Sequence, residues 1–288
     1  MTTSSNAHTS TGSLWMLVAC LNFSLMGLCV KWGATDFGTT TLVFYRSLFG
    51  MVFLLIVARQ PLRAYASSHW LRHIGRSASG LISLWLYFIA LGHLPLATAV
   101  TLNYTSPLFL AAYLHLVHPE ESRPGLILFL VMGFCGVLLL LHPHLTREQT
   151  PYVLIGLASG VGAGISYAQI RSMSRLGEPD WRVVFYFTTL SSAVTGCLLP
   201  YQPHISWTPS HIAILAGLGL FATLGQLTMT RAYRTGITLV VANLAYATIV
   251  FSSLLGMLLL QERLSGETWL GMGIVILAGV ASSRWRAS

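Results

Sequence analysis

The apolar residues of this chain fall into ten long runs, and this pattern constrains its fold more than any other feature. The runs span residues 14–32, 39–58, 77–92, 95–117, 124–141, 151–170, 183–199, 210–230, 237–260 and 267–283. Most approach the roughly 20 residues with which an α-helix crosses the hydrocarbon core of a bilayer. They lack the period-two alternation of membrane strands. We therefore expect an all-α integral membrane protein with ten transmembrane helices.

Charged residues are scarce, at 8% of the chain, and the basic ones are distributed unevenly between the loops. With ten spans both termini lie on one side, and that side carries twelve basic residues while the other carries three. By the positive-inside rule, the tails formed by residues 1–13 and 284–288 are expected in the cytoplasm. Arg72 and Arg76 precede the short third run, and we expect them to extend to the membrane surface. The net charge of +8 therefore reflects topology and not nucleic-acid binding, because the arginines form no continuous stripe.

The two halves of the chain resemble each other at a spacing of about 141 residues. Val43-Phe44-Tyr45 recurs as Val184-Phe185-Tyr186, for example, and Glu121 recurs as Glu262 after a similar apolar run. This defines one repeat over 14–141 and another over 151–283. Five spans per repeat is an odd number, so the second repeat must cross the membrane in the opposite sense. Inverted repeats of this kind are typical of alternating-access carriers.

One proline distinguishes the fourth span from its counterpart in the second repeat. Pro107 removes a backbone donor and is expected to kink the helix. The corresponding residue is Thr248, so we expect the two halves not to be kinked identically.

Two motifs join this doubled pattern. The first repeat contains LPLATAVTLNYTSPLFL at 94–110 before the acidic turn at Glu120-Glu121, and the second contains LLLQERLSG before GMGIVILAGV. Over nearly its whole length the sequence resembles the ten-helix EamA-type carriers of the drug/metabolite transporter superfamily, and most of all bacterial exporters of amino acids, aromatic ones included, and related metabolites. The resemblance implies a bacterial inner-membrane location. It also implies a central cavity lined by the first four helices of each half, with the fifth and tenth helices peripheral.

Polar and aromatic side chains inside the runs are the candidate cavity residues. Buried polar groups are costly in hydrocarbon, so a helix face that carries several of them should contact water or protein. We expect these faces to surround an uncharged polar cavity, although hydrogen bonding between helices would explain the same pattern. The candidate substrate-binding residues are Asn22, Ser83, Trp85, Tyr87, Asn103, Tyr104, Ser166, Gln169, Gln226, Asn243 and Tyr246.

Arg46 is the fixed charge that this pattern places well inside a span, and a buried guanidinium requires an anion. It is expected to bind either a substrate carboxylate or Glu262, which the topology places on the same side of the membrane. The inverted counterpart of the second arrangement pairs Arg182 with Glu120 or Glu121. Such pairs are candidate gates.

Signatures of other protein classes are missing from the sequence. No Walker A loop, G-x-S-x-G motif or HExxH motif occurs, so we expect no enzymatic activity, cofactor, metal or associated ATPase subunit. All acidic residues fall in loops or at span edges, which disfavours a carboxylate proton relay and favours facilitated movement or exchange.

Our main hypothesis is an exporter of small amphipathic metabolites, neutral and aromatic amino acids among them, that acts as a monomer or weak homodimer. The alternatives are an importer of a cofactor-like solute, an intramembrane lipid-modifying enzyme and a scaffold or receptor without transport activity.

Overall fold

The computed structural model describes residues 3–94, 96–119, 124–141, 150–201, 207–259 and 266–284, and the regular elements in these ranges are all helical. The first half contains α1 Thr3–Gly33, α2 Thr39–Ala58, α3 Leu62–Tyr65, α4 Trp70–His93, α5 Leu96–Asn103, α6 Ser106–Val117 and α7 Pro124–Leu141. The second contains α8 Thr150–Arg175, α9 Asp180–Gly196, the short 3-10 helix η3 Leu199–Tyr201, α10 Pro209–Thr235, α11 Thr238–Leu244, α12 Ala247–Leu259 and α13 Gly266–Arg284.

Six stretches of the described helices are long and apolar enough to cross a membrane. They are Gly12–Gly33, Thr39–Ala58, Trp70–His93, Thr150–Arg175, Pro209–Thr235 and Thr238–Leu259. Shorter apolar stretches occupy Pro124–Leu139 in α7 and Trp269–Ala281 in α13. The expected all-helical membrane fold is confirmed.

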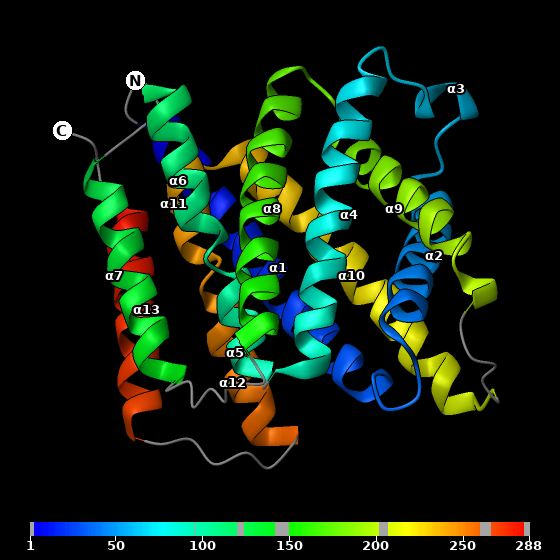
Figure 1. Cartoon of the computed structure of the whole chain (residues 1–288). Coiled ribbons are helices and arrows are strands. Elements are labelled where there is room, and N and C mark those ends of the chain that lie inside the picture. The colour runs from blue at the N-terminus through cyan, green and yellow to red at the C-terminus, as the bar shows by residue number, and fades with distance from the viewer. Residues whose placement is uncertain are drawn as a thin grey trace.

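The two halves cross the molecule in opposite senses (Figure 1). In this view α1 runs downward from the face where α13 ends, whereas α8, which opens the second half, runs upward. The α1–α2 turn lies at the lower end of the bundle and the α8–α9 turn at the upper end. The halves interlock, because α1 packs on α10 of the second half and α4 packs on α8.

Both the fourth and the ninth predicted spans are broken near their middle. The first break separates α5 from α6 at Tyr104 and Thr105, just before Pro107, and the second separates α11 from α12 at Ala245 and Tyr246. The kink expected at Pro107 is therefore confirmed, whereas the expected contrast between the halves is wrong as to the presence of a break, because the helix of the second half breaks at the equivalent place.

Local hydrogen bonding explains the second break, where no proline occurs. The amides of Thr248 and Ile249 bond to the carbonyls of Ala245 and Tyr246, three residues back. Because of this tight turn, some backbone carbonyls lack the N–H partner that an unbroken helix would provide. Side chains of α1 donate hydrogen bonds to them instead. The Cys20 thiol lies 3.4 Å from the Leu244 carbonyl oxygen.

Glycines on α8 allow the broken fourth span to approach closely. A Cβ on Gly156 would lie 2.8 Å from the Leu102 side chain, and one on Gly164 would lie 3.0 Å from the Ser106 carbonyl oxygen. At the edge of the molecule, α7 packs along α13 (Figure 1). These two helices are the predicted fifth and tenth spans.

Candidate functional site

A cavity of about 740 Å³, including the part open to solvent, lies between the two halves. Its walls come from α1, α2, α4, α5 and the first break, and from α8, α9, α10 and α12 of the other half. None of its lining residues lies on α7 or α13. This is the arrangement that the resemblance implied. The lining residues are Phe23, Met26, Gly27, Arg46, Arg76, Gly80, Ser83, Leu84, Tyr87, Val100, Asn103, Tyr104, Ala163, Ser166, Tyr167, Phe187, Gln226, Met229, Thr248 and Ser252.

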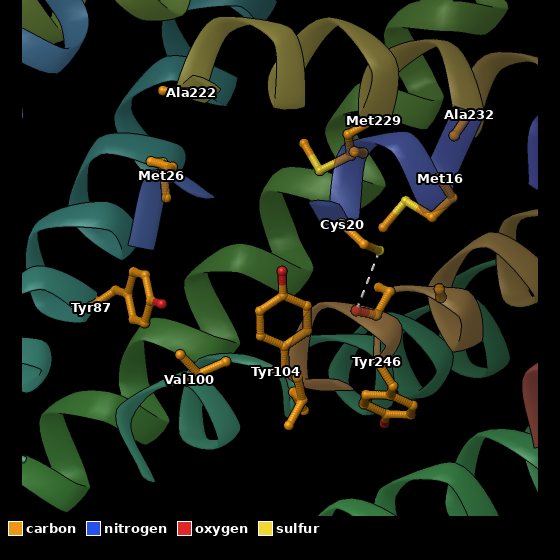
Figure 2. Packing of buried hydrophobic residues seen from close by; sticks show 14 of the residues in the cluster. Met16, Cys20, Met26, Tyr87, Val100, Tyr104, Ala222, Met229, Ala232 and Tyr246 are labelled. Carbon is orange, nitrogen blue, oxygen red and sulfur yellow. Dashed lines mark hydrogen bonds between the residues drawn. The ribbon is translucent and has the colours of Figure 1, made fainter. Parts of the chain in front are cut away.

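Six of the eleven predicted substrate-binding residues meet at this cavity. They are Ser83, Tyr87, Asn103, Tyr104, Ser166 and Gln226. The first four come from the first half of the chain and the other two from the second. Figure 2 shows the phenol rings of Tyr87 and Tyr104 approaching the same space, whereas the ring of Tyr246 points away from it.

The other five predicted residues do not line the cavity. Asn22 donates to the Val18 carbonyl of its own helix, and Gln169 accepts a hydrogen bond from Ser79 at 2.7 Å. Asn243 donates to the Ala278 carbonyl of α13 at 3.0 Å, and a Cβ on Gly133 of α7 would lie 2.9 Å from the Tyr246 ring. These four residues make contacts within and between helices, which was the alternative interpretation of the polar faces. Trp85 is half-buried on α4.

The position of Arg76 contradicts two expectations: that it extends to the membrane surface, and that the cavity is uncharged. It does not extend to the membrane surface, because its side chain is 2% exposed and lines the cavity. The cavity is therefore not uncharged, since Arg46, also 2% exposed, lines it as well. The hydropathy pattern missed Arg76 because the third apolar run begins after it, whereas α4 begins at Trp70. One signal was available: Arg76, Ser83 and Tyr87 are spaced so that they share one helix face.

The two arginines lie against one aromatic ring. The guanidinium carbons of Arg76 and Arg46 are 4.4 Å and 5.5 Å from the centroid of Phe187. A ring at this distance attracts a cation through its quadrupole. Gly80 provides the space, because a Cβ there would lie 2.5 Å from Nη1 of Arg76 and 3.0 Å from the ring.

The two helix breaks meet beside the arginines. The Tyr104 hydroxyl of the first break bonds to Oγ1 of Thr248 at 2.8 Å, at the start of α12. Ser24 of α1 donates to the Thr248 carbonyl at 3.0 Å and lies 3.1 Å from the Ser252 hydroxyl. Hydroxyl groups thus connect the two broken helices to each other and α12 to α1.

Arg182, predicted as a gate residue, bonds a different acid from those expected. Its Nη1 lies 2.9 Å from Oε2 of Glu178, and its Nε donates to the Ala64 carbonyl at 2.8 Å. Glu121 and Glu262, the predicted partners of Arg182 and Arg46, lie outside the described residues. Glu178 was not predicted because it falls in a loop between two apolar runs.

Glu178 is the centre of a cluster in the α8–α9 turn, which lies at the upper end of the bundle in Figure 1. Its carboxylate accepts a hydrogen bond from Ser67 and lies 3.1 Å from Nδ1 of His69 and 3.3 Å from Nε2 of His73. Burial raises the pKa of this carboxyl, but hydrogen bonds from Ser67, Arg182, His69 and His73 outweigh that effect and lower it to about 2. The cluster joins the α8–α9 turn to the start of α4.

A smaller pair occupies the equivalent position at the other end of the molecule. Asp36, in the α1–α2 turn, lies 3.4 Å from Nε2 of His211 in the first turn of α10. Asp36 and His211 are each 142 residues away from their counterparts Glu178 and His69. The repeat therefore places one acid–histidine pair at each end of the bundle (Figure 1).

Within the described residues, no group of three or more His, Cys, Asp or Glu side chains is arranged to hold a metal ion. The lining of the cavity offers hydroxyl, amide and guanidinium groups beside aromatic rings. These groups are suited to binding a small amphipathic solute.

Comparison with known proteins also indicates a membrane transporter. The pseudopaline exporter CntI of Pseudomonas aeruginosa is 28% identical over 273 residues, covering 95% of this chain and 96% of the exporter. A riboflavin transporter of Vibrio cholerae is 24% identical over 289 residues, covering 96% of this chain and 94% of that protein. A crystal structure with 20% sequence identity covers 96% of this chain with a TM-score of 0.81, which shows a common fold.

The family comparison is the most specific. The EamA-like transporter family matches the chain twice, over residues 10–142 and 150–284, once in each half. Its members are carriers and not enzymes, which agrees with the cavity between the halves. The chain therefore belongs to the EamA-like transporter family and is a multi-pass membrane transporter of small molecules.

Proposed function

We propose that this protein exports small amphipathic metabolites, neutral and aromatic amino acids among them, by exposing the central cavity alternately to the two sides of the membrane. One observation carries the proposal: the first four spans of both inverted halves contribute to a single cavity. A site between two repeats becomes accessible from either side when one repeat rocks against the other. The export direction is supported by the similarity to the pseudopaline exporter.

The cavity lining matches a solute with an apolar and a polar part. Phe23, Met26 and Met229 supply apolar surface, whereas Asn103 and Gln226 supply amide groups. Rings of the solute can stack on the tyrosines and on Phe187, which adds contact energy to burial.

The acid–histidine pairs are suited to act as gates. Glu178 connects the α8–α9 turn to α4 at the end where α1 begins and α13 ends, and Asp36 connects the α1–α2 turn to α10 at the other end (Figure 1). In our proposal, the Glu178 end faces the cytoplasm of a bacterial cell, as the distribution of basic residues favours. Breaking one pair while the other stays formed would open the cavity on one side at a time.

Import of a cofactor-like solute is the second candidate. The similarity to riboflavin transporters favours it, because those relatives cover nearly the whole chain. The two candidates share the cavity and differ in direction and solute.

Flux in proteoliposomes tests the proposal. Purified protein is reconstituted with a labelled metabolite mixture inside or outside, and the transported compounds are identified by mass spectrometry. We expect protein-dependent movement of amphipathic compounds down their gradients. Accumulation driven by an imposed pH step would contradict the facilitated or exchange mode. Absence of any flux in either direction would contradict the transport proposal.

A pair of glycine variants shows whether the cavity is the route. Gly27 lines the cavity, and a Cβ there meets nothing within 4 Å, so Gly27→Leu is expected to fill the cavity without disturbing the fold. Gly92 has the same open surroundings at the exposed end of α4, so Gly92→Leu is the matched control. Loss of flux in Gly27→Leu alone supports the proposed route, and equal flux in both variants contradicts it.

A further inference from the structure

We propose that the preferred solute is an organic anion, whose carboxylate or similar planar oxyanion binds between Arg46 and Arg76 while its apolar part packs on the aromatic lining. This inference rests on the proposed function and specifies its substrate class: acidic compounds are preferred to neutral and zwitterionic compounds of the same shape.

The first observation is the buried positive charge. Arg46 and Arg76 are each 2% exposed, and both guanidinium groups lie within 5.5 Å of the Phe187 ring centroid. An arginine remains protonated in proteins, so two like charges face the same small space. Taking such charges out of water is costly unless an anion compensates them.

The second observation is the scarcity of partners. Nε of Arg46 and both Nε and Nη1 of Arg76 are buried without a hydrogen-bond acceptor among the described residues. Nη2 of Arg76 donates to the amide oxygen of Gln226 at 3.2 Å, which is a neutral acceptor. Phe187 attracts both cations but offers no acceptor for their N–H groups. Each of these unused donors can bond one oxygen of a carboxylate, and hydrogen bonds between a guanidinium and a carboxylate are among the strong ones.

The third observation is the position of the acids. Among the described residues, no acidic side chain lines the cavity. Glu178 is bound to Arg182 and its histidines, Asp180 lies 3.3 Å from Arg234, and Asp36 lies beside His211. A cationic or ammonium group of a solute would therefore meet two guanidinium groups and no described carboxylate. This disfavours cations and makes the amino group of a zwitterion a disadvantage.

Glu262 is the competing partner for Arg46. Ser252 is the lining residue nearest the end of α12, and the helix continues for seven more residues to Leu259, a rise of about 10 Å. Glu262 follows that end in the sequence. Substitution distinguishes the two partners of Arg46. If Arg46 pairs with Glu262, replacing either residue breaks the pair and should have the same effect.

A series of related probes tests the charge preference by binding, independently of transport. The probes are 3-phenylpropionate, phenylsuccinate, phenylalanine, 3-phenylpropionamide and phenethylamine, which share one ring and differ in charge. Binding is measured as the shift in thermal unfolding of the detergent-purified protein, and inhibition of flux is measured in parallel. We expect the two acids to bind most tightly and phenethylamine least.

Arginine variants identify the groups that bind the acids. Arg46→Gln and Arg76→Gln are expected to weaken acid binding by about 10- to 100-fold, the effect of losing hydrogen bonds between charged groups, with little change for 3-phenylpropionamide. Arg63→Gln is the matched control, because Arg63 is exposed on α3. Equal binding of acids and amides, or unchanged acid binding in both cavity variants, would overturn the inference.

Three further results separate the remaining explanations. If Glu262→Gln weakens acid binding as strongly as Arg46→Gln, the role of Arg46 toward the solute is overturned. If flux is observed but shows no charge preference, the anion inference fails and the transport proposal stands. If acids bind with the expected preference and nothing is transported, the transport proposal fails instead. A variant that does not fold is replaced by Arg76→Lys, which keeps the charge and is expected to retain part of the acid preference.

Discussion

Arg76 is a buried charge in the cavity lining, and its cost to stability can be measured. Its guanidinium is buried near that of Arg46, and two of its three nitrogens have no acceptor in the part of the chain that the structure describes. Functional positions commonly carry such a cost. We predict that Arg76→Met raises the thermal unfolding midpoint of the solute-free protein, because an apolar chain of similar length removes the buried charge. A gain of about 1 kcal/mol corresponds to roughly 2–4 °C.

The measurement is thermal unfolding in detergent, with Arg63→Met as the exposed control. A lower midpoint for Arg76→Met than for the wild type would show that the guanidinium is satisfied in the solute-free protein. The same variant is expected to lose acid binding, so that stability and binding change in opposite directions.

From the sequence, the chemical type of the cavity residues was predicted more successfully than their individual positions. Ser83, Tyr87 and Asn103 were predicted because polar groups on one helix face are costly in lipid. Asn243 and Tyr246 satisfied the same criterion but pack against α13 and α7, since hydrogen bonding between helices produces the same pattern. Which of these environments surrounds a face depends on tertiary packing, which a single sequence does not contain.

At the scale of helices, the bond between the two breaks is a structural connection across the repeats. Tyr104 and Thr248 come from opposite halves, and their hydroxyl groups are 2.8 Å apart in a buried position. We predict that Tyr104→Phe and Thr248→Val each destabilise the protein. We also expect a double-mutant cycle to give a coupling energy of about 0.5–1.5 kcal/mol. Either single substitution already removes the hydrogen bond, so the second substitution costs less in the double variant.

Unfolding in mixed detergent micelles measures the cycle. The matched control combines Tyr104→Phe with Thr228→Val, since Thr228 is on α10 and its hydrogen bonds to described residues lie within its own helix. Strict additivity for Tyr104 and Thr248 would indicate that their hydroxyl groups do not interact in the membrane-embedded protein.

Hydropathy predicted the existence of the helices but not their breaks. The runs at 39–58 and 124–141 have the same bounds as α2 and α7, because apolar length is what a bilayer selects. The break between α11 and α12 depends on hydrogen bonds to residues three positions back and on donors from α1. Neither changes the hydropathy of the run, so the break was not predictable from it.

The Glu178 cluster, in the turn between α8 and α9, makes the stability of the folded protein depend on pH. Its carboxyl has an ordinary pKa of 4.5, and hydrogen bonds in the folded protein lower it to about 2. A lowered pKa contributes stability that is complete above about pH 4.5 and is lost as the pH falls toward 2. The groups facing this carboxylate are Ser67, His69, His73 and Arg182.

We predict that the unfolding midpoint of the wild type falls more steeply between pH 5 and pH 3 than that of Glu178→Gln, measured in the same detergent. Other acids titrate in both proteins and cancel in the comparison. Parallel profiles would mean that the Glu178 carboxyl is not stabilised in its ionised form.

At the scale of the whole molecule, the inverted repeat predicts opposite effects of equivalent substitutions. Glu178 connects elements at one end of the bundle, and Asp36 connects the equivalent elements at the other (Figure 1). Removing one charge weakens the closure of one end only, so the population should shift toward the conformation that is open there. We predict that Glu178→Gln increases access to the cavity from the side of the termini, whereas Asp36→Asn increases access from the other side.

The probe is a cysteine at Ser166 in the cavity lining, labelled with a membrane-impermeant thiol reagent from either side of oriented vesicles. The exposed Cys135 and Cys197 are first replaced by serine, while Cys20 and Cys29 are buried. The double variant is expected to restore a labelling ratio close to that of the parent, because the two effects oppose each other. A shift of both single variants in the same direction would be incompatible with gates related by the repeat.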